Sequence, residues 1–187
     1  NAVFLPFGHT WFKKDQYEKN HTKEFKIAHL CGKLLKTYGH SLRHEILARE
    51  NELTNPTKFY DVYGDRYNIE EARIGKEEIF GNVQYGVAIE NVSHRGYFSE
   101  KILDCFLLKT IPIYWGCTNI SDYFNKDSII EFGNVDDFIY IVNKLDKDFY
   151  TKKEIIEENY QLALKYVNYE KNIVKKIIEI FKYNNLT

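Results

Sequence analysis

Hydrophobic positions along the chain follow two periods, one typical of strands and one typical of helices. Short apolar or alternating runs at 27–31, 59–63, 83–90, 111–115 and 128–132 predict strands. Segments with helical periodicity lie between or after them, at 41–51, 99–109, from 134, from 151 and from about 168. Strands that alternate with helices favour a parallel sheet with helices on both faces, so we expect an α/β fold that ends in C-terminal helices.

Three of the predicted helices carry a recognisable start. Ser41 and Asn134 are each followed by apolar residues at helical spacing and are predicted N-caps. Thr151 with Glu154 three residues later forms a capping-box pattern.

The two ends of the chain differ from its middle. Residues 1–25 are mixed, with apolar side chains such as Phe4, Phe7 and Phe12 followed by a polar stretch, and are interpreted as a connector. Residues 26–187 are interpreted as one domain. The last helix has an apolar stripe flanked by lysines, formed by Ile173, Val174, Ile177, Ile178 and Phe181. Peripheral membrane contact would suit this stripe, but we favour packing against its own domain.

Charge and composition exclude several classes of function. The 187 residues hold 26 basic and 27 acidic side chains, which argues against nucleic acid as the partner. Three cysteines without metal-ligand spacing indicate neither a disulfide framework nor a zinc site, and a reducing compartment suits them. No apolar run reaches about 18 residues and no signal pattern is seen, so a cytoplasmic location is expected. The absence of methionine predicts a trimmed piece with further sequence upstream.

The densest polar cluster, 90–101, lies between the strand at 83–90 and the helix at 99–109. Loops at the carboxyl ends of parallel strands are where such sheets bind ligands. Lys101 and the amides of the helix start suit a phosphate, and Asn91 and Tyr97 can donate to its oxygens. Glu100 is better suited to accept hydrogen bonds from ribose hydroxyls. The alternative is that Ser99 and Glu100 only cap a helix and Lys101 is solvated. His94, Arg95 and Ser99 are further candidates.

A second polar loop, 39–45, precedes the helix at 41–51. Its Arg43 could bind a diphosphate through its planar fork, or form a surface salt bridge with Glu45 or a neighbour, which we favour for this residue taken alone. The chain has no P-loop, GxSxG elbow, HExxH motif or paired CxxC motif.

The segment 87–104, continued by 111–116, resembles the donor-binding signature of the α1,3-fucosyltransferases, glycosyltransferase family 10. The shared pattern is an apolar strand, Glu-Asn, a variable loop, Tyr, Ser-Glu-Lys, an apolar helix, and an apolar strand with Pro that ends in Gly. Weaker similarity covers 41–43 and 59–64.

The resemblance implies a Rossmann-like domain, one half of a GT-B fold, that binds GDP-fucose for inverting transfer of fucose to a glycan acceptor. In this family's pattern Arg43 and Lys101 neutralise the diphosphate, Asn91 and Tyr97 hydrogen-bond it, and Glu100 holds the ribose. No cofactor and no metal are implied, because stabilisation of the leaving group by Arg43 and Lys101 needs no divalent metal bound by an Asp-x-Asp motif.

The resemblance also implies that the general base is a carboxylate of an N-terminal domain, outside this chain. We therefore expect donor binding, with transfer weak or absent unless that separate or upstream domain is supplied. Two alternatives are a non-catalytic nucleotide-sugar-binding or interaction module, and a transferase that uses another GDP- or UDP-sugar.

Overall fold

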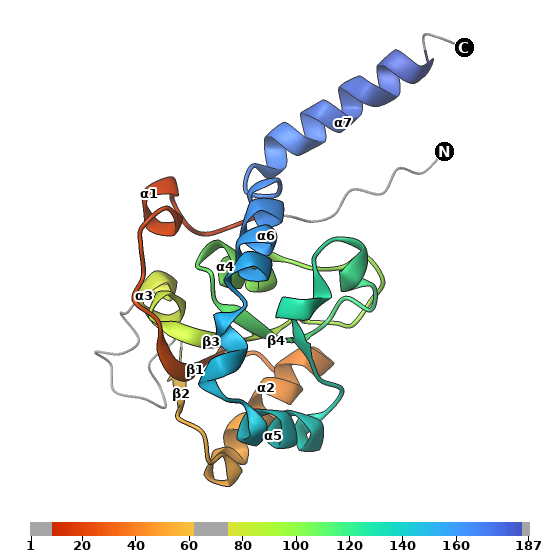
Figure 1. The fold of residues 1–187 in the computed structure, drawn as a ribbon. Helices are drawn as coiled ribbons and strands as arrows, with labels where there is room; N and C mark the ends of the chain where they lie inside the picture. The colour runs from red at the N-terminus through yellow and green to blue at the C-terminus, as the bar shows by residue number, and fades with distance from the viewer. Residues whose placement is uncertain (1–8, 62–74, 185–187) are drawn as a thin grey trace.

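The computed structural model describes residues 9–61 and 75–184, which form a five-stranded parallel sheet (Figure 1). The strand order is β2-β1-β3-β4-β5 and every neighbouring pair is parallel. The predicted parallel sheet is therefore confirmed. Its strands are β1 (Glu24–Cys31), β2 (Thr57–Asp61), β3 (Val83–Ile89), β4 (Ile111–Trp115) and β5 (Ile130–Glu131).

Helices cover both faces of the sheet, as the alternating pattern predicts. α3 (Lys76–Gly81), α4 (Glu100–Leu107) and most of α6 (Lys153–Leu164) share one buried apolar cluster with β-strand residues such as Ala88. α2 (Tyr38–Ala48) and α5 (Val135–Lys144) share a second cluster with Tyr85 and Val87. Because successive side chains of a strand point to opposite faces, β3 contributes to both clusters and is buried along most of its length.

Hydrogen bonds confirm the predicted cap at Asn134 and the capping role that was the alternative for Ser99. The Ser99 hydroxyl accepts from the amide of Lys101 at the start of α4, and the Asn134 side chain accepts from the amide of Asp137 at the start of α5. Each satisfies an amide that has no partner inside its helix.

Two other predicted helix starts are wrong. α2 begins at Tyr38 after an extended Thr37, so Ser41 lies inside the helix and Arg43 in its second turn. Thr151 ends a 3₁₀ helix, Lys147–Thr151, and its hydroxyl donates to the carbonyl of Asp148 at 2.6 Å. The N-cap position of α6 is Lys152, one residue later, and the side chain of Lys152 does not cap this helix start.

Two predicted strands have shifted bounds. β2 starts two residues earlier than the apolar run at 59–63, and the end of that run with Gly64 lies outside the described residues. The run at 128–132 keeps only the two residues of β5, because a 3₁₀ turn, Lys126–Ser128, precedes it.

The segment before β1 packs against the domain. After a short helix, α1 (Lys14–Tyr17), the chain enters β1 at Glu24. Phe12 is buried in the cluster around α4, and the Thr10 hydroxyl donates to Asp104 of α4 at 2.8 Å. Phe4 and Phe7 lie outside the described residues.

The last helix, α7 (Tyr169–Asn184), projects away from the sheet in Figure 1. Asn168 caps it by accepting from the amide of Lys171 at 3.0 Å. Packing of its apolar stripe on the domain, which we favoured, is wrong: Val174, Ile177, Ile178 and Phe181 are between 46% and 65% exposed. Within the described part of the chain, no helix is both long and apolar enough to cross a membrane.

Candidate functional site

The strand order places a topological switch point between β1 and β3. From β1 the chain runs to α2 on one face, whereas from β3 it runs to α4 on the other. The loops that follow the two strands therefore diverge and leave a crevice at their carboxyl ends, where open parallel sheets bind ligands. Both polar loops of the sequence, 39–45 and 90–101, meet there.

Glu90 is the buried centre of this crevice. It follows β3, is fully buried, and its carboxylate accepts from the Ser99 amide at 2.8 Å and the Ser99 hydroxyl at 2.6 Å. Burial raises the pKa of Glu90, while nearby Lys101 and the two hydrogen bonds from Ser99 act in the opposite direction. The Glu90 carboxylate thus fixes the start of α4.

Lys101 lies on the first turn of α4 and points back toward Glu90. Its amine lies 3.0 Å from Glu100, 3.0 Å from the Ser99 hydroxyl and 3.6 Å from Glu90. The side chain is 24% exposed. The alternative in which Lys101 is solvated is therefore wrong, because the amine is held by two carboxylates.

Arg43 enters the same crevice from α2. The residue is 8% exposed, and its guanidinium donates to the carbonyl of Ile89 and lies 3.4 Å from the Asn91 side-chain oxygen. Burial lowers the pKa of Arg43. The favoured salt bridge with Glu45 is wrong, because helix α2 turns Arg43 inward, to the end of β3.

Tyr97 completes the cluster. Its pKa is raised by burial and by the neighbouring carboxylates Glu90 and Glu100, while Lys101 and Arg43 lower it. Tyr97 is therefore within electrostatic reach of Arg43, Glu100 and Lys101. Asn91 joins them through its contact with Arg43. The five predicted donor-binding residues thus lie together at the switch point: Arg43, Asn91, Tyr97, Glu100 and Lys101.

The three further candidates have other positions. His94 is exposed and bonds through its Nδ1 to the carbonyl of Arg95 at 2.8 Å. Arg95 faces Asp122 at 3.5 Å. Ser99 is buried as the cap of α4, so its hydroxyl belongs to the framework.

The backbone amides at the start of α4 are less open than the sequence suggests. The Ser99 amide donates to Glu90, and the Lys101 amide donates to the Ser99 hydroxyl at 3.5 Å. The Glu90 carboxylate already occupies the anion-favouring end of this helix. An incoming phosphate would therefore meet the side chains of Lys101 and Arg43 rather than these two amides.

Two glycines that sequence reasoning did not select allow the crevice to close. A Cβ on Gly39 would overlap the carbonyl oxygen of Glu90, and one on Gly116 would collide with the Glu90 side chain. The Gly39 amide donates to the carbonyl of Asn91 at 3.1 Å. No local signal marked either glycine, because the sequence around Gly39 predicts a loop and Gly116 only ends a predicted strand.

His40 is a second residue that sequence reasoning missed. It is buried in the first turn of α2, and its Nδ1 is 2.6 Å from the Thr37 hydroxyl. Burial lowers its pKa, and so do Arg43 and Lys101. His40 thus lies within electrostatic reach of both predicted phosphate ligands. Within 9–61 and 75–184, no three His, Cys, Asp or Glu side chains are grouped so as to hold a metal ion.

The fold and the cluster define a class: an α/β domain whose charged site occupies the switch point at which such domains bind nucleotides. The chain belongs to glycosyltransferase family 10, because the family's fucosyltransferase C-terminal model matches residues 48–179. That match includes Asn91, Tyr97, Glu100 and Lys101, whereas Arg43 precedes it.

Individual relatives agree with this assignment. The chain is 31% identical over 121 residues to the alpha-(1,3)-fucosyltransferase FucT of Helicobacter pylori, covering 62% of this chain and 24% of that protein. It is also 31% identical over 83 residues to the GDP-fucose protein O-fucosyltransferase 3 of Xenopus laevis, covering 42% of this chain and 18% of that protein. The chain thus spans about a quarter or less of these relatives.

Solved structures confirm the fold. A crystal structure of an alpha1,3-fucosyltransferase matches with a TM-score of 0.57 at 22% identity, over 89% of this chain and 47% of that one. A crystal structure of an alpha1,3-fucosyltransferase with GDP matches with a TM-score of 0.56 at 22% identity, over 89% and 49%. The chain therefore corresponds to about half of such a protein, as expected for one half of a GT-B fold.

Proposed function

We propose that this chain is the donor-binding part of an inverting fucosyltransferase that uses GDP-fucose and a glycan acceptor. The observation that carries the proposal is the convergence of Arg43 and Lys101 on the β1/β3 switch point, from helices on opposite faces of the sheet. Two cations at one crevice suit a diphosphate, whose negative charge increases as the sugar leaves. Family membership and the GDP named for one structural relative support the choice of nucleotide.

Donor binding would exchange partners within the cluster. Lys101 would turn from Glu100 toward the diphosphate, and Arg43 would add its fork from the side of α2. Asn91 and Tyr97 would donate to phosphate oxygens. Glu100, released from Lys101, would accept from the ribose hydroxyls.

The general base is proposed to come from outside this cluster. Glu90 is fully buried, and both Ser99 and Lys101 hold its carboxylate. A base must reach the acceptor hydroxyl directly or through one water, which this position does not allow. We therefore expect the isolated chain to bind the donor without appreciable transfer.

Isothermal titration calorimetry of the chain with GDP and GDP-fucose tests the proposal. Lys101→Ala and Arg43→Ala should each weaken GDP binding by about 1.5–3 kcal/mol, the usual range for hydrogen bonds to charged groups. Lys109→Ala is the matched control, because Lys109 follows the other end of α4 and pairs with Glu157 at 2.8 Å. It should leave GDP affinity unchanged.

The outcomes separate the alternatives. If neither GDP nor GDP-fucose binds the folded chain, the proposed donor site is wrong. If UDP-sugars displace GDP in a competition series, the site is correct but the donor is different. If GDP binds and both alanine variants keep full affinity, the residue roles are wrong.

A further inference from the structure

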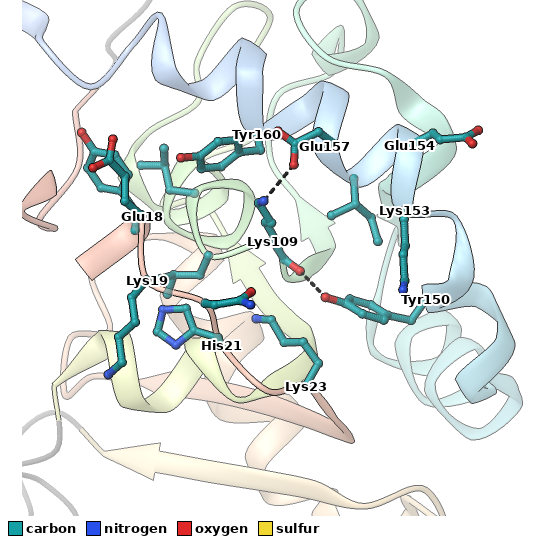
Figure 2. Close-up of a pocket in the computed structure, with 15 residues that line it drawn as sticks. Glu18, Lys19, His21, Lys23, Lys109, Tyr150, Lys153, Glu154, Glu157 and Tyr160 are labelled. Atoms are coloured by element: carbon teal, nitrogen blue, oxygen red, sulfur yellow. Dashed lines mark hydrogen bonds and ion pairs between the residues drawn. The ribbon is translucent and has the colours of Figure 1, made fainter. Parts of the chain in front are cut away.

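A cavity of about 910 Å³ lies at the end of the sheet where the strands begin, here called the amino edge. It is opposite the carboxyl edge, where the strands end and the crevice at the switch point lies. Three segments line it: the stretch before β1, the residues at the end of α4, and the segment from Tyr150 into α6. Figure 2 shows His21 and Lys23 on the first wall and Tyr150 and Lys153 across from them. The cavity contains none of the five predicted donor-binding residues.

Lys23 is the unusual group in this cavity. Its amine donates to the Thr110 hydroxyl at 2.7 Å and to the carbonyl of Phe80 at 3.2 Å. Thr110 uses its own proton for the same carbonyl, at 2.6 Å, so it can only accept from Lys23. Both partners of Lys23 are therefore neutral acceptors. A neutral amine satisfies both with its two N–H groups and keeps its lone pair.

No carboxylate pairs with Lys23 among residues 9–61 and 75–184. On its own segment, Glu18 pairs with Lys14 at 3.4 Å and Lys19 pairs with Glu77 at 3.2 Å. His21 lines the same wall and bonds through Nε2 to the carbonyl of Gln16.

The charged groups on the other elements around the cavity do not pair with Lys23 either. Lys109 pairs with Glu157 at 2.8 Å, and Tyr150 donates its hydroxyl to the carbonyl of Lys109. Lys153 and Glu154 lie at the outer wall and bring one charge of each sign. Behind Lys23, burial raises the pKa of the Cys105 thiol to about 12, so Cys105 is neutral.

Burial without an anion favours the neutral amine. Desolvation lowers the pKa of Lys23 to about 7. At pH 7 about half of such an amine is neutral, against about one in three thousand for a lysine of ordinary pKa. A neutral lysine that lines an open cavity has the properties of a nucleophile.

We propose that Lys23 is a reactive amine that captures small aldehydes as imines within this cavity. The nitrogen lone pair attacks the carbonyl carbon, a C–N bond forms, and a proton moves from nitrogen to oxygen to give a carbinolamine. The C–O bond then breaks, the remaining N–H proton goes to the leaving oxygen, and water departs as the nitrogen lone pair forms the C=N bond to Lys23. One amine and one aldehyde thus give one imine and one water, and no oxidant or reductant is needed. This site is independent of the proposed donor site.

The experiment uses pyridoxal 5′-phosphate as the aldehyde, with imines fixed by borohydride and located by peptide mass spectrometry. At pH 7 Lys23 should be labelled at least about tenfold faster than the exposed Lys126. Its rate should level off above pH 7, whereas that of Lys126 should continue to rise toward pH 10. A lysine that only bridges Phe80 and Thr110 would not show this profile.

Two variants complete the test. Lys23→Arg keeps a cation and hydrogen-bond donors but cannot form an imine, so the fast-labelled site should disappear. Lys109→Arg, in the same cavity, should keep it. If Lys23→Arg does not fold, the rates measured on the wild-type chain decide alone. Labelling of Lys23 no faster than that of Lys126 would overturn the proposal.

Discussion

The two edges of the sheet each hold a partly buried lysine amine and surround it with different chemistry. At the carboxyl edge, Lys101 lies between two carboxylates and a hydroxyl, at 3.0–3.6 Å. At the amino edge, Lys23 has a hydroxyl and a carbonyl. The first arrangement pairs a cation with anions and suits exchange for phosphate, whereas the second favours loss of the proton.

The two edges also differ in how tightly they are packed. The carboxyl edge is closed by contacts that exclude even a Cβ at Gly39 and Gly116. The amino edge has an open cavity of about 910 Å³. Open volume thus marks the amino edge, whereas clustered charge marks the carboxyl edge. The proposed donor site is occupied by its own side chains, so its charge distinguishes it and its volume does not.

The largest expected effect comes from removing the anion of the carboxyl edge. Glu90→Ala should cost about 3–5 kcal/mol of unfolding free energy, because it leaves the buried Ser99 donors without their acceptor and removes one of the two carboxylates that hold Lys101. Urea unfolding measures it. Glu90→Gln is the matched variant and should lose less, since it keeps one acceptor oxygen. Equal, small losses in both variants would mean that Glu90 does not anchor α4.

The next effect tests the close packing of that edge. Gly39→Ala should cost about 3 kcal/mol, the upper end for overpacking, because the methyl group would meet backbone that cannot move aside. Gly75→Ala is the control, since a Cβ there meets nothing within 4 Å. If urea unfolding gives both variants the wild-type midpoint, α2 does not pack on β3 as closely as described.

The lowered pKa of Lys23, at the amino edge, should make the stability of the folded chain depend on pH. The pKa of Lys23 is lowered to about 7 in the folded chain, so the unfolded chain binds more protons above that pH. Stability relative to Lys23→Met should therefore rise with pH, by up to about 1.4 kcal/mol per unit and about 2 kcal/mol between pH 7 and 8.5. Denaturant unfolding of both proteins across this window measures it. If the stability difference between the two proteins does not change with pH, the pKa of Lys23 is not lowered and an anion must lie near its amine.

Local signals explain what the sequence could predict. β4 and the Asn134 cap of α5 agree with expectation to the residue, because an apolar run and a cap are defined by neighbours in the chain. The cluster that we propose binds the donor was also predictable, since four of its five residues lie in one loop and helix start. The start of α2 was missed because Gly39 indicates a loop, while contact with Glu90 makes it part of a helix.

Long-range contacts explain what the sequence could not show. Arg43 bonds to the carbonyl of Ile89, 46 residues away, and no local pattern distinguishes that contact from a surface salt bridge. Lys23 meets Thr110 across 87 residues. Its cavity is built from three separate segments, each of which is an ordinary polar stretch when considered alone.

The smallest effect concerns α4, the helix that runs from one edge toward the other. Burial raises the pKa of its Asp104 to about 6, although Lys76 and Thr10 both contact the carboxylate. Below this value the folded chain holds a proton that the unfolded chain, with an aspartate pKa of about 4, has released. Stability relative to Asp104→Asn should therefore fall by about 1.5 kcal/mol as pH rises from 4 to 5.5, the opposite sign to Lys23. Thermal unfolding of both proteins across that range measures the difference. A stability difference that instead grows with pH would show that the ion pair with Lys76 outweighs the effect of burial on Asp104. In that case α4 would carry an ion pair at Asp104 as well as the one between Lys101 and Glu90 at the carboxyl edge.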